Sequence, residues 1–312
     1  MLRDISERMT AEMRKVVVGQ DDAVGLLLAA ATVGGHILIE GVPGVAKTLL
    51  ANALARTMAV KFQRVQFTPD TSPTDITGGI GPGQLGMTFH KGPIFTNVLL
   101  ADEINRTPPH VQAALLEAMQ ERQVTVASET HPLPDPFIVI ATQNPIAQEG
   151  TWPLPEAQLD RFLFKIDMGY PSVEDERAIL ELAHRGVEPA TLLSVNSVVI
   201  GTDLVEARAI VDATALSPAV IAYITTIIRK TRDLPAVSLG ASPRAGVHLV
   251  AAAKVKARLA GRDAVEPEDV GAMALPVLRH RLGLHSEAIG DGYSPDDVLW
   301  ELIASIPVPG KV

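Results

Sequence analysis

The sequence of 312 residues contains no cysteine, which excludes disulfide bonds, thiolate metal sites and cysteine nucleophiles. Aromatic residues make up only 4% of the chain, although 47% of it is hydrophobic. We therefore expect a core built from aliphatic side chains and rich in helices, rather than an aromatic β-sandwich. The length is enough for about two domains.

Basic residues are outnumbered by acidic ones, so the net charge is −9 and the isoelectric point is near 5.4. This balance gives no overall attraction to nucleic acid or to anionic membranes, so a nucleic-acid partner is not expected. Two short basic runs, RKTR at 229–232 and RHR at 279–281, are more typical of solvated helix faces than of a nucleic-acid surface. The histidines at 280 and 285 lack the spacing of a compact metal pair.

Long apolar runs are missing as well. Residues 23–39 lack formal charge, but a glycine pair and a histidine interrupt them, so they predict a helix followed by a buried strand rather than a membrane span. The first 17 residues mix both charges and lack the apolar core and the cleavage site of a secretory signal. A cytoplasmic location is therefore the expectation.

The first half of the chain alternates short apolar runs with helical patterns. The runs lie at 36–40, 62–67, 97–101, 137–142 and 161–166, with core-facing helices expected at 48–59 and 108–121. This alternation predicts an α/β domain with a mostly parallel sheet. Two segments interrupt it and resemble protruding hairpins: the glycine-rich segment 76–92 and the segment 123–136.

Strand signals fade after about residue 170. Helical patterns follow near 173–185, 203–213, 217–232, 243–260 and 266–281. We therefore predict two domains, an α/β core at 1–170 and a smaller helical domain at 171–312.

The segment GVPGVAKT at 41–48 follows an apolar strand and precedes a helix, which is the context of a phosphate-binding loop. In this motif backbone amides bind phosphate oxygens, Lys47 lies near the β- and γ-phosphates, and the Thr48 hydroxyl ligates Mg²⁺. Ala46 replaces the second glycine of the general pattern, which is tolerable if its φ is helical and costly if its φ is positive. The residues expected to contact the nucleotide are Gly41, Val42, Pro43, Gly44, Val45, Ala46, Lys47, Thr48 and Leu49.

Two further apolar strands end in polar residues. NVLLADEINR at 97–106 delivers Asp102, suited to hold Mg²⁺ through its water shell, and Glu103, suited to polarise the attacking water. FIVIATQNP at 137–145 delivers Asn144, whose amide could orient that water. Alone, each segment would also fit an ordinary loop or turn. In this order after a phosphate-binding loop, they predict an enzyme that binds ATP and Mg²⁺ and hydrolyses ATP.

In order and spacing, the segments GVPGVAKT, LLADEINR, ALLEAMQERQVT, ATQNP, LPEAQLDRF and SPRA resemble the MoxR family of AAA+ ATPases over nearly the whole chain. The resemblance implies an AAA+ P-loop fold with a central parallel sheet and a smaller helical lid. Segment 76–92 resembles the helix-2 insert of that family, and 123–136 resembles its hairpin before sensor 1.

The resemblance also implies several residue roles. By similarity, Asn144 is sensor 1, Arg161 is the arginine finger that completes a neighbouring subunit's site, and Arg244 is sensor 2 of the lid. A guanidinium can stabilise charge on a transferring phosphoryl group. Val18, Gly19 and Gln20 resemble the strip that borders the adenine. Whether Arg244 acts in cis or in trans stays open, and residues 186–202 match nothing in the family.

The leading hypothesis is a MoxR-like ring, with six subunits expected, that uses ATP to remodel or activate partner proteins as a chaperone does. Family members often work with proteins that contain a von Willebrand factor A domain, and this chain lacks the DxSxS motif of such a domain. The partner is therefore expected to be a separate chain.

Three other functions compete with it. The ATPase subunit of a magnesium-chelatase-like complex shares the insertions and the motif order. A DNA-translocating motor needs basic hairpins, but here they carry only Lys91 and Arg122 beside Glu129 and Asp135. A scaffold that binds ATP without hydrolysing it would not need the combination of Glu103, Asn144 and Arg161.

Overall fold

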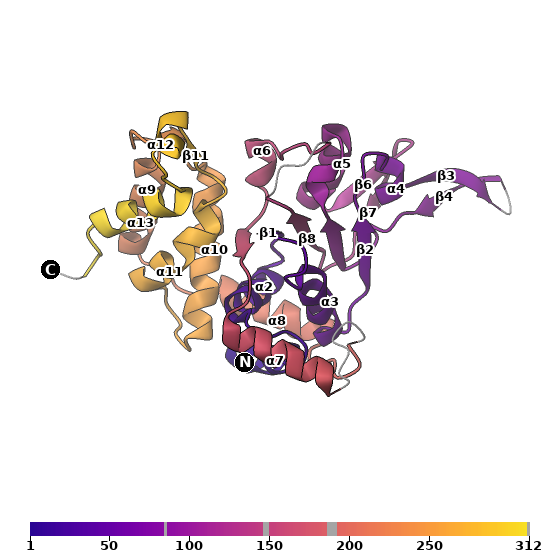
Figure 1. The fold of residues 1–312 in the computed structure, drawn as a ribbon, viewed down its shortest axis with the longest axis horizontal. Coiled ribbons are helices and arrows are strands. Elements are labelled where there is room, and N and C mark those ends of the chain that lie inside the picture. The colour runs from indigo at the N-terminus through magenta and orange to yellow at the C-terminus, as the bar shows by residue number, and fades with distance from the viewer. Residues whose placement is uncertain (84–85, 146–149, 186–191, 311–312) are drawn as a thin grey trace.

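A parallel sheet of five strands forms the centre of the molecule (Figure 1). The computed structural model describes residues 1–83, 86–145, 150–185 and 192–310. The strands lie in the order β2-β5-β8-β1-β9 and all neighbouring pairs are parallel. They are β1 (Ile37–Gly41), β2 (Phe62–Gln66), β5 (Val98–Asp102), β8 (Ile138–Gln143) and β9 (Phe164–Met168). Each predicted apolar run forms a strand, so the predicted parallel sheet is confirmed.

Both faces of the sheet are covered, because successive side chains of a strand point to opposite sides. In β1, Ile37 and Ile39 belong to one apolar cluster, whereas Leu38 belongs to the other. The first cluster includes residues of α1 (Leu2–Met13), α2 (Asp21–Val33), α3 (Lys47–Thr57) and α8 (Gly201–Asp212). The second includes residues of α4 (Pro73–Thr77) and α5 (Pro109–Glu121). The helices predicted at 48–59 and 108–121 are thus confirmed as core-facing.

The two interrupting segments are hairpins, as predicted. The first consists of β3 (Gly78–Gly83) and β4 (Gly86–Lys91) and projects from the end of the molecule that lies away from the C-terminus (Figure 1). The second consists of β6 (Gln123–Val126) and β7 (Glu129–Pro132). The rings of Phe89 and His131 stack with centroids 4.2 Å apart, so the hairpins support each other.

The C-terminal half is helical. The short helices η1 (Ile104–Arg106), after β5, and α6 (Glu156–Leu159), before β9, belong to the core. The elements after β9, besides α8, are α7 (Val173–His184), α9 (Pro218–Lys230), β10 (Val237–Leu239), α10 (Pro243–Leu259), α11 (Pro267–Leu278), β11 (Gly283–Leu284), α12 (Ser286–Gly290) and α13 (Pro295–Ser305). The five helices predicted after residue 170 are confirmed. The sequence analysis did not predict α1, α12, α13 or the short β10-β11 pair.

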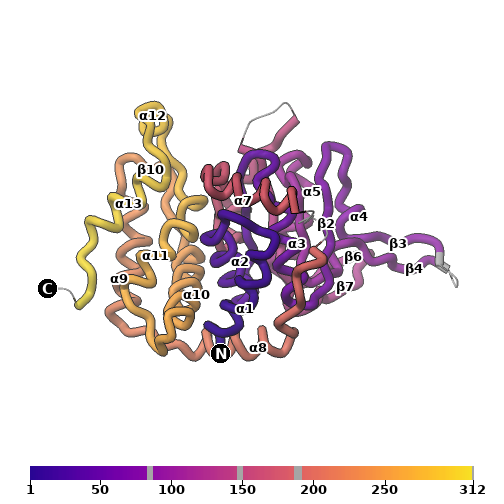
Figure 2. Tube along the Cα trace, turned by 60° about the horizontal axis from the view of Figure 1, so that its bottom comes forward, coloured from indigo at the N-terminus to yellow at the C-terminus, as the bar shows by residue number. Residues whose placement is uncertain are grey.

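The helical half packs closely on the core. Helix α10 lies beside α1 and α2 (Figure 2), and a single apolar cluster includes side chains of α2, α8, α10 and α11. Helix α8 packs on α2 of the core, and the domain boundary near residue 170 stays a prediction. In the described part of the chain, no helix is long and apolar enough to cross a membrane.

One interpretation is wrong. The run RHR at 279–281 is not a solvated helix face, because His280 is 7% exposed and Arg281 only 5% exposed. Both side chains point into the contact between the helical half and the segment that precedes β9, and both bond to carbonyl oxygens of that segment. A buried arginine needs many hydrogen-bond acceptors, and short motifs do not reveal whether the fold supplies them.

Candidate nucleotide-binding site

Three neighbouring strands deliver the predicted phosphate-binding and catalytic residues to one edge of the sheet. Strands β5, β8 and β1 are adjacent and parallel, so their carboxyl ends lie side by side. β1 leads into the loop at 41–48, β5 ends at Asp102 and is followed by Glu103, and β8 is followed by Asn144. The topology therefore brings Lys47, Asp102, Glu103 and Asn144 to the same edge, where ligands bind in open parallel sheets.

The phosphate-binding loop has two residues in the left-handed backbone region. Gly44 has a φ of 89°, and its missing Cβ would point into open space. Ala46 has a φ of 67° and precedes α3, which begins at Lys47. The alternative left open for Ala46 is thereby decided: the residue adopts the conformation that is costly for a side chain with a Cβ.

Lys47 lies at the centre of this edge. Its ammonium donates hydrogen bonds to the carbonyl oxygens of Gly41, at 2.5 Å, and Gln143, at 3.4 Å. Partial burial lowers the pKa of Lys47, and the nearby charges of Asp102, Glu103 and Glu40 oppose that shift. The same carboxylates therefore face the ammonium, which shows that the loop and the end of β5 converge.

The donor set suits a nucleotide triphosphate with Mg²⁺. Lys47 provides an ammonium with three donors, and the first turn of α3 provides backbone amides and the Thr48 hydroxyl. Asp102 adds a carboxylate, the kind of ligand that Mg²⁺ takes singly while it keeps water and phosphate oxygens as its other ligands. Among the described residues, no cluster of three or more His, Asp or Glu side chains could hold a metal by itself. Such a site would be completed by the nucleotide.

The side chain of Asp102 is almost fully buried, and both of its carboxylate oxygens accept hydrogen bonds. Oδ1 accepts a hydrogen bond of 2.6 Å from the hydroxyl of Thr142, and Oδ2 accepts bonds of 3.0 and 2.7 Å from the guanidinium of Arg64. Thr142 lies on β8 and Arg64 on β2, the two strands that flank β5. The orientation of this carboxylate is thus set by both neighbouring strands.

Glu103 stands in a strained backbone conformation, with a φ of 58°. Its N–H donates to the Thr142 hydroxyl at 2.9 Å, so one threonine holds both acidic residues. Glu103 Oε2 accepts bonds of 2.9 Å from the Gln66 amide and 3.0 Å from Arg106. The sequence analysis missed Arg64, Gln66 and Thr142. Arg64 and Gln66 are two residues apart on β2, so their side chains point to the same face of the sheet. This spacing predicts no contact with Asp102 or Glu103 until β2 is known to pair with β5.

The predicted adenine strip lies at the same edge of the sheet. Gly19 has a φ of 70°, and a Cβ there would lie 2.4 Å from the Asp175 Cγ at the start of α7. Gly19 and Gln20 line an open cavity of about 850 Å³ together with Asp167 of β9 and Arg279 after α11. Val18 is half-buried and does not line this cavity.

The two predicted arginines lie at the opposite edge. Phe164 at the start of β9 is level with Ile37, and Met168 at its end is level with Gly41. A strand rises by about 3.3 Å per residue, so the two edges are roughly 13 Å apart at this strand. Arg161 precedes β9 and therefore lies beyond the edge that faces away from the phosphate-binding loop.

Arg161 and Arg244 share a cavity of about 270 Å³ at that second edge. Its lining also includes Arg122, together with Gly34, Gly35 and His36, which precede β1. The described residues that line this cavity include none of the phosphate-binding loop. Arg161 donates a hydrogen bond of 3.1 Å to the Gln120 side chain. One chain thus carries an acidic and phosphate-binding half at one edge and a cationic half at the other.

Comparisons with known proteins agree with this arrangement. Residues 36–164 match the ATPase family associated with various cellular activities (AAA), and residues 229–302 match the AAA lid domain. The chain is 44% identical to Chaperone MoxR1 of Mycobacterium tuberculosis, over 97% of this chain and 82% of that protein. It is 36% identical to Protein MoxR of Methylorubrum extorquens, over 90% and 88% of the two chains. A crystal structure described as that of an ATPase from Cytophaga hutchinsonii has a TM-score of 0.90 and 39% identity, covering 98% of this chain and 96% of the other.

The conformation of Ala46 leads to a stability prediction. Ala46→Gly removes the Cβ that disfavours a left-handed backbone, so we expect the free energy of unfolding to rise by about 1 kcal/mol. Ala55→Gly is the matched control, because Ala55 lies inside α3 and the same change should lower stability by about 1 kcal/mol. Denaturant unfolding of both variants measures the difference. A destabilised Ala46→Gly variant would contradict the strain assigned to this loop.

Proposed function

The chain belongs to the MoxR family of AAA+ ATPases and hydrolyses ATP, and from this premise we propose that it works as a ring whose active sites lie between subunits. The single observation that carries the proposal is the separation of the two halves of the site across the sheet. A residue before β9 cannot reach a phosphate bound after β1 in the same chain. In a ring, head-to-tail contacts place the cationic edge of one copy against the acidic edge of the next.

Within each such site, the residues divide the work as follows. Bound MgATP would supply the phosphoanhydride to be cleaved and a divalent cation that offsets the phosphate charge. Lys47 and the amides of the loop would bind the phosphates, while Thr48 and Asp102 would hold the cation. Glu103 accepts the proton of the attacking water, and Asn144 orients that water. Arg161 of the adjacent copy stabilises the negative charge that builds up on the transferred group.

We assign Arg244 to the same trans half as Arg161. Both guanidiniums line the cavity at the second edge, and Arg244 lies 4.0 Å from the carboxylate of Asp160, the neighbour of Arg161. Two arginines that share one cavity approach the same neighbouring nucleotide when the edges meet. This placement supports trans action, one of the two alternatives that the sequence left open for Arg244.

The role of Glu103 can be tested by a single isosteric change. Glu103→Gln keeps the size of the side chain but removes the proton acceptor, so we expect ATP hydrolysis to slow by roughly 10²-fold or more. ATP affinity should change by less than about twofold, because binding depends on the loop and on Lys47. Steady-state turnover and calorimetric ATP titration measure the two quantities. Glu206→Gln on the exposed side of α8 is the control, and normal turnover of Glu103→Gln would remove Glu103 from this role.

The shared site can be tested by mixing inactive subunits. Arg161→Ala subunits keep an intact phosphate-binding half, and Lys47→Ala subunits keep an intact cationic half. In an equal and random mixture, about one quarter of the interfaces pair the two intact halves, so ATPase activity should recover. Arg244→Ala with Lys47→Ala should recover in the same way. Mixtures that stay inactive at every ratio would show that the arginines act within their own subunit.

For the work done by the ring, we propose chaperone-like remodelling of a partner protein. A relative that is 44% identical over 97% of this chain is named a chaperone. The β3-β4 hairpin carries exposed Ile80 and Met87, apolar side chains that a protein partner could bind. Arg122, one of the two basic residues that the sequence analysis assigned to the hairpins, is half-buried and donates to the carbonyl oxygens of Gly34 and Phe137. This disfavours a DNA-translocating motor, which needs basic hairpin surfaces.

The partner proposal also has a direct test. Because Glu103→Gln is expected to bind ATP without hydrolysing it, that variant should hold its partner in a long-lived complex. Affinity purification from native cells with ATP, followed by mass spectrometry, should recover proteins with a von Willebrand factor A domain. Lys47→Ala serves as the control that cannot enter the ATP state. Equal recovery of such proteins with both variants, or none with either, would contradict the proposed partner class.

A further inference from the structure

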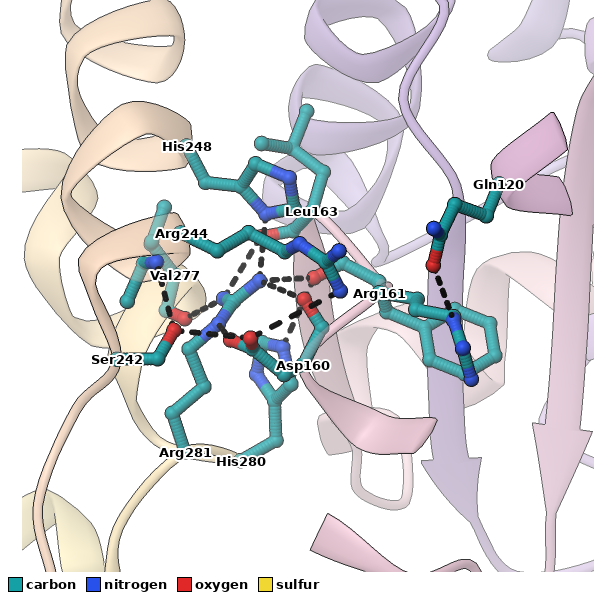
Figure 3. A network of polar contacts seen from close by, with 12 residues as sticks. Gln120, Asp160, Arg161, Leu163, Ser242, Arg244, His248, Val277, His280 and Arg281 are labelled. Atoms are coloured by element: carbon teal, nitrogen blue, oxygen red, sulfur yellow. Dashed lines mark hydrogen bonds and ion pairs between the residues drawn. The ribbon is translucent and has the colours of Figure 1, made fainter. Parts of the chain in front are cut away.

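Arg281, in the RHR run after α11, is the most deeply buried guanidinium of the contact between the lid and the core. Its side chain is 1% exposed, and its Nε donates to Asp160 Oδ1 at 2.8 Å (Figure 3). Burial lowers the pKa of Arg281 to about 10, while the hydrogen bond and the charge of Asp160 oppose that shift. The guanidinium is therefore charged at neutral pH and paired with the residue next to Arg161.

Arg281 also donates hydrogen bonds to backbone carbonyl oxygens that lie before and after Arg161 in the chain. Its Nη2 donates to the carbonyl oxygen of Asp160 at 3.0 Å and to that of Phe162 at 2.5 Å, and its Nη1 donates to the carbonyl oxygen of Leu163 at 3.4 Å. The planar guanidinium of Arg281 thus holds the backbone on both sides of Arg161 (Figure 3). The backbone that carries Arg161 is positioned by a residue of the lid.

The second oxygen of Asp160 ties the same segment to the helix of Arg244. Asp160 Oδ2 accepts a hydrogen bond of 2.8 Å from the hydroxyl of Ser242, and Ser242 caps α10, whose second residue is Arg244. Asp160 therefore connects Arg281, the start of α10 and Arg161. A movement of the lid relative to the core must shift the segment of Arg161 or break these bonds.

Two neutral histidines complete the surroundings of Arg281. His248 Nδ1 accepts a bond of 2.5 Å from Arg281 Nη2, and His280 Nε2 donates to the carbonyl oxygen of Phe162 at 3.0 Å. Burial and, to a smaller extent, the charge of Arg281 lower the pKa of His248 to about 4. Burial lowers the pKa of His280 well below its ordinary value. Among the described residues, Asp160 forms ion pairs with Arg281 and, at the longer distance of 4.0 Å, with Arg244.

We propose that Arg281 is a positioning residue that couples the lid to the arginine finger, so that the lid of one subunit sets the place of Arg161 in the neighbour's active site. This inference rests on the proposed trans action of Arg161. A buried ion pair adds little net stability compared with apolar side chains of similar size. Removing Arg281 alone, however, leaves the largely buried carboxylate of Asp160 without its main partner and also lowers stability, so ATP hydrolysis and subunit mixing have to report the effect on the geometry of the finger.

Arg281→Gln removes the charge and most of the donors of the guanidinium. We expect the ATPase kcat to fall about 10- to 100-fold, because a displaced catalytic group of this kind loses roughly that much. ATP affinity should stay within about twofold, since the phosphate-binding half lies at the other edge of the sheet. Arg281→Lys keeps a positive charge beside Asp160 but cannot hold three carbonyl oxygens, so it should also lower kcat and serves as the variant that folds if the glutamine variant does not.

Arg262→Gln is the matched control. Arg262 donates to both oxygens of Asp269 at 2.7 and 2.5 Å, and that ion pair lies wholly within the lid, with Asp269 2% exposed. Arg262 is more exposed than Arg281, at 31% against 1% of the side chain, but its loss likewise leaves a buried aspartate unpaired and does not touch the segment of Arg161. We expect its kcat to stay within about twofold of the unaltered protein.

Subunit mixing separates a misplaced finger from a damaged lid. Arg281→Gln or Arg281→Lys subunits mixed with Lys47→Ala subunits should regain activity, because the intact finger then comes from the Lys47→Ala copy. Recovery here, together with recovery of the Arg161→Ala mixture, supports the inference. Recovery with Arg161→Ala alone, or an unchanged kcat of the Arg281 variants, overturns it and leaves the shared site standing. If neither mixture recovers, the trans finger itself is wrong.

Discussion

Every strand of the central sheet runs in the same direction, so the carboxyl ends of β5, β8 and β1 meet at one edge and the segment before β9 lies at the other. Loops that follow the strands can carry adjacent acidic and phosphate-binding groups, and the rest of the site depends on this arrangement. The same geometry keeps Arg161 and Arg244 away from the phosphate-binding loop of their own chain. In the proposed function, strand direction is therefore the reason that a complete site needs two copies.

At each edge of the sheet, one residue makes hydrogen bonds to two different partners and so holds them together. At the acidic edge, the hydroxyl of Thr142 donates to Asp102 and accepts from the backbone of Glu103. At the cationic edge, Asp160 accepts from Ser242 and from Arg281. Behind the acidic edge, the buried Gln112 amide donates to the carbonyl oxygens of Thr107, after η1, and of Trp152, before α6, and so ties these two segments together.

The sequence predicted the features that depend on local pattern. Apolar runs located all five strands, and glycine-rich and polar interruptions located both hairpins. Helix α1 was not predicted, although Leu2, Ile5, Met9 and Met13 recur at helical spacing and share one buried face. Arg64 and Gln66 could not be predicted, because strand order decides their partners. Arg281 was misread because its acceptors are backbone carbonyls far away in the chain, which no residue pattern encodes. The backbone conformation of Ala46 likewise required coordinates.

The link between Asp160 and the lid has a consequence for the proposed ring. In that ring each subunit would bind nucleotide at one edge and offer its arginines to the next subunit at the other edge. A movement of the lid would then reach the site of one particular neighbour through Asp160. In such an assembly, the order in which neighbouring subunits hydrolyse ATP follows from the direction in which the subunits are arranged around the ring.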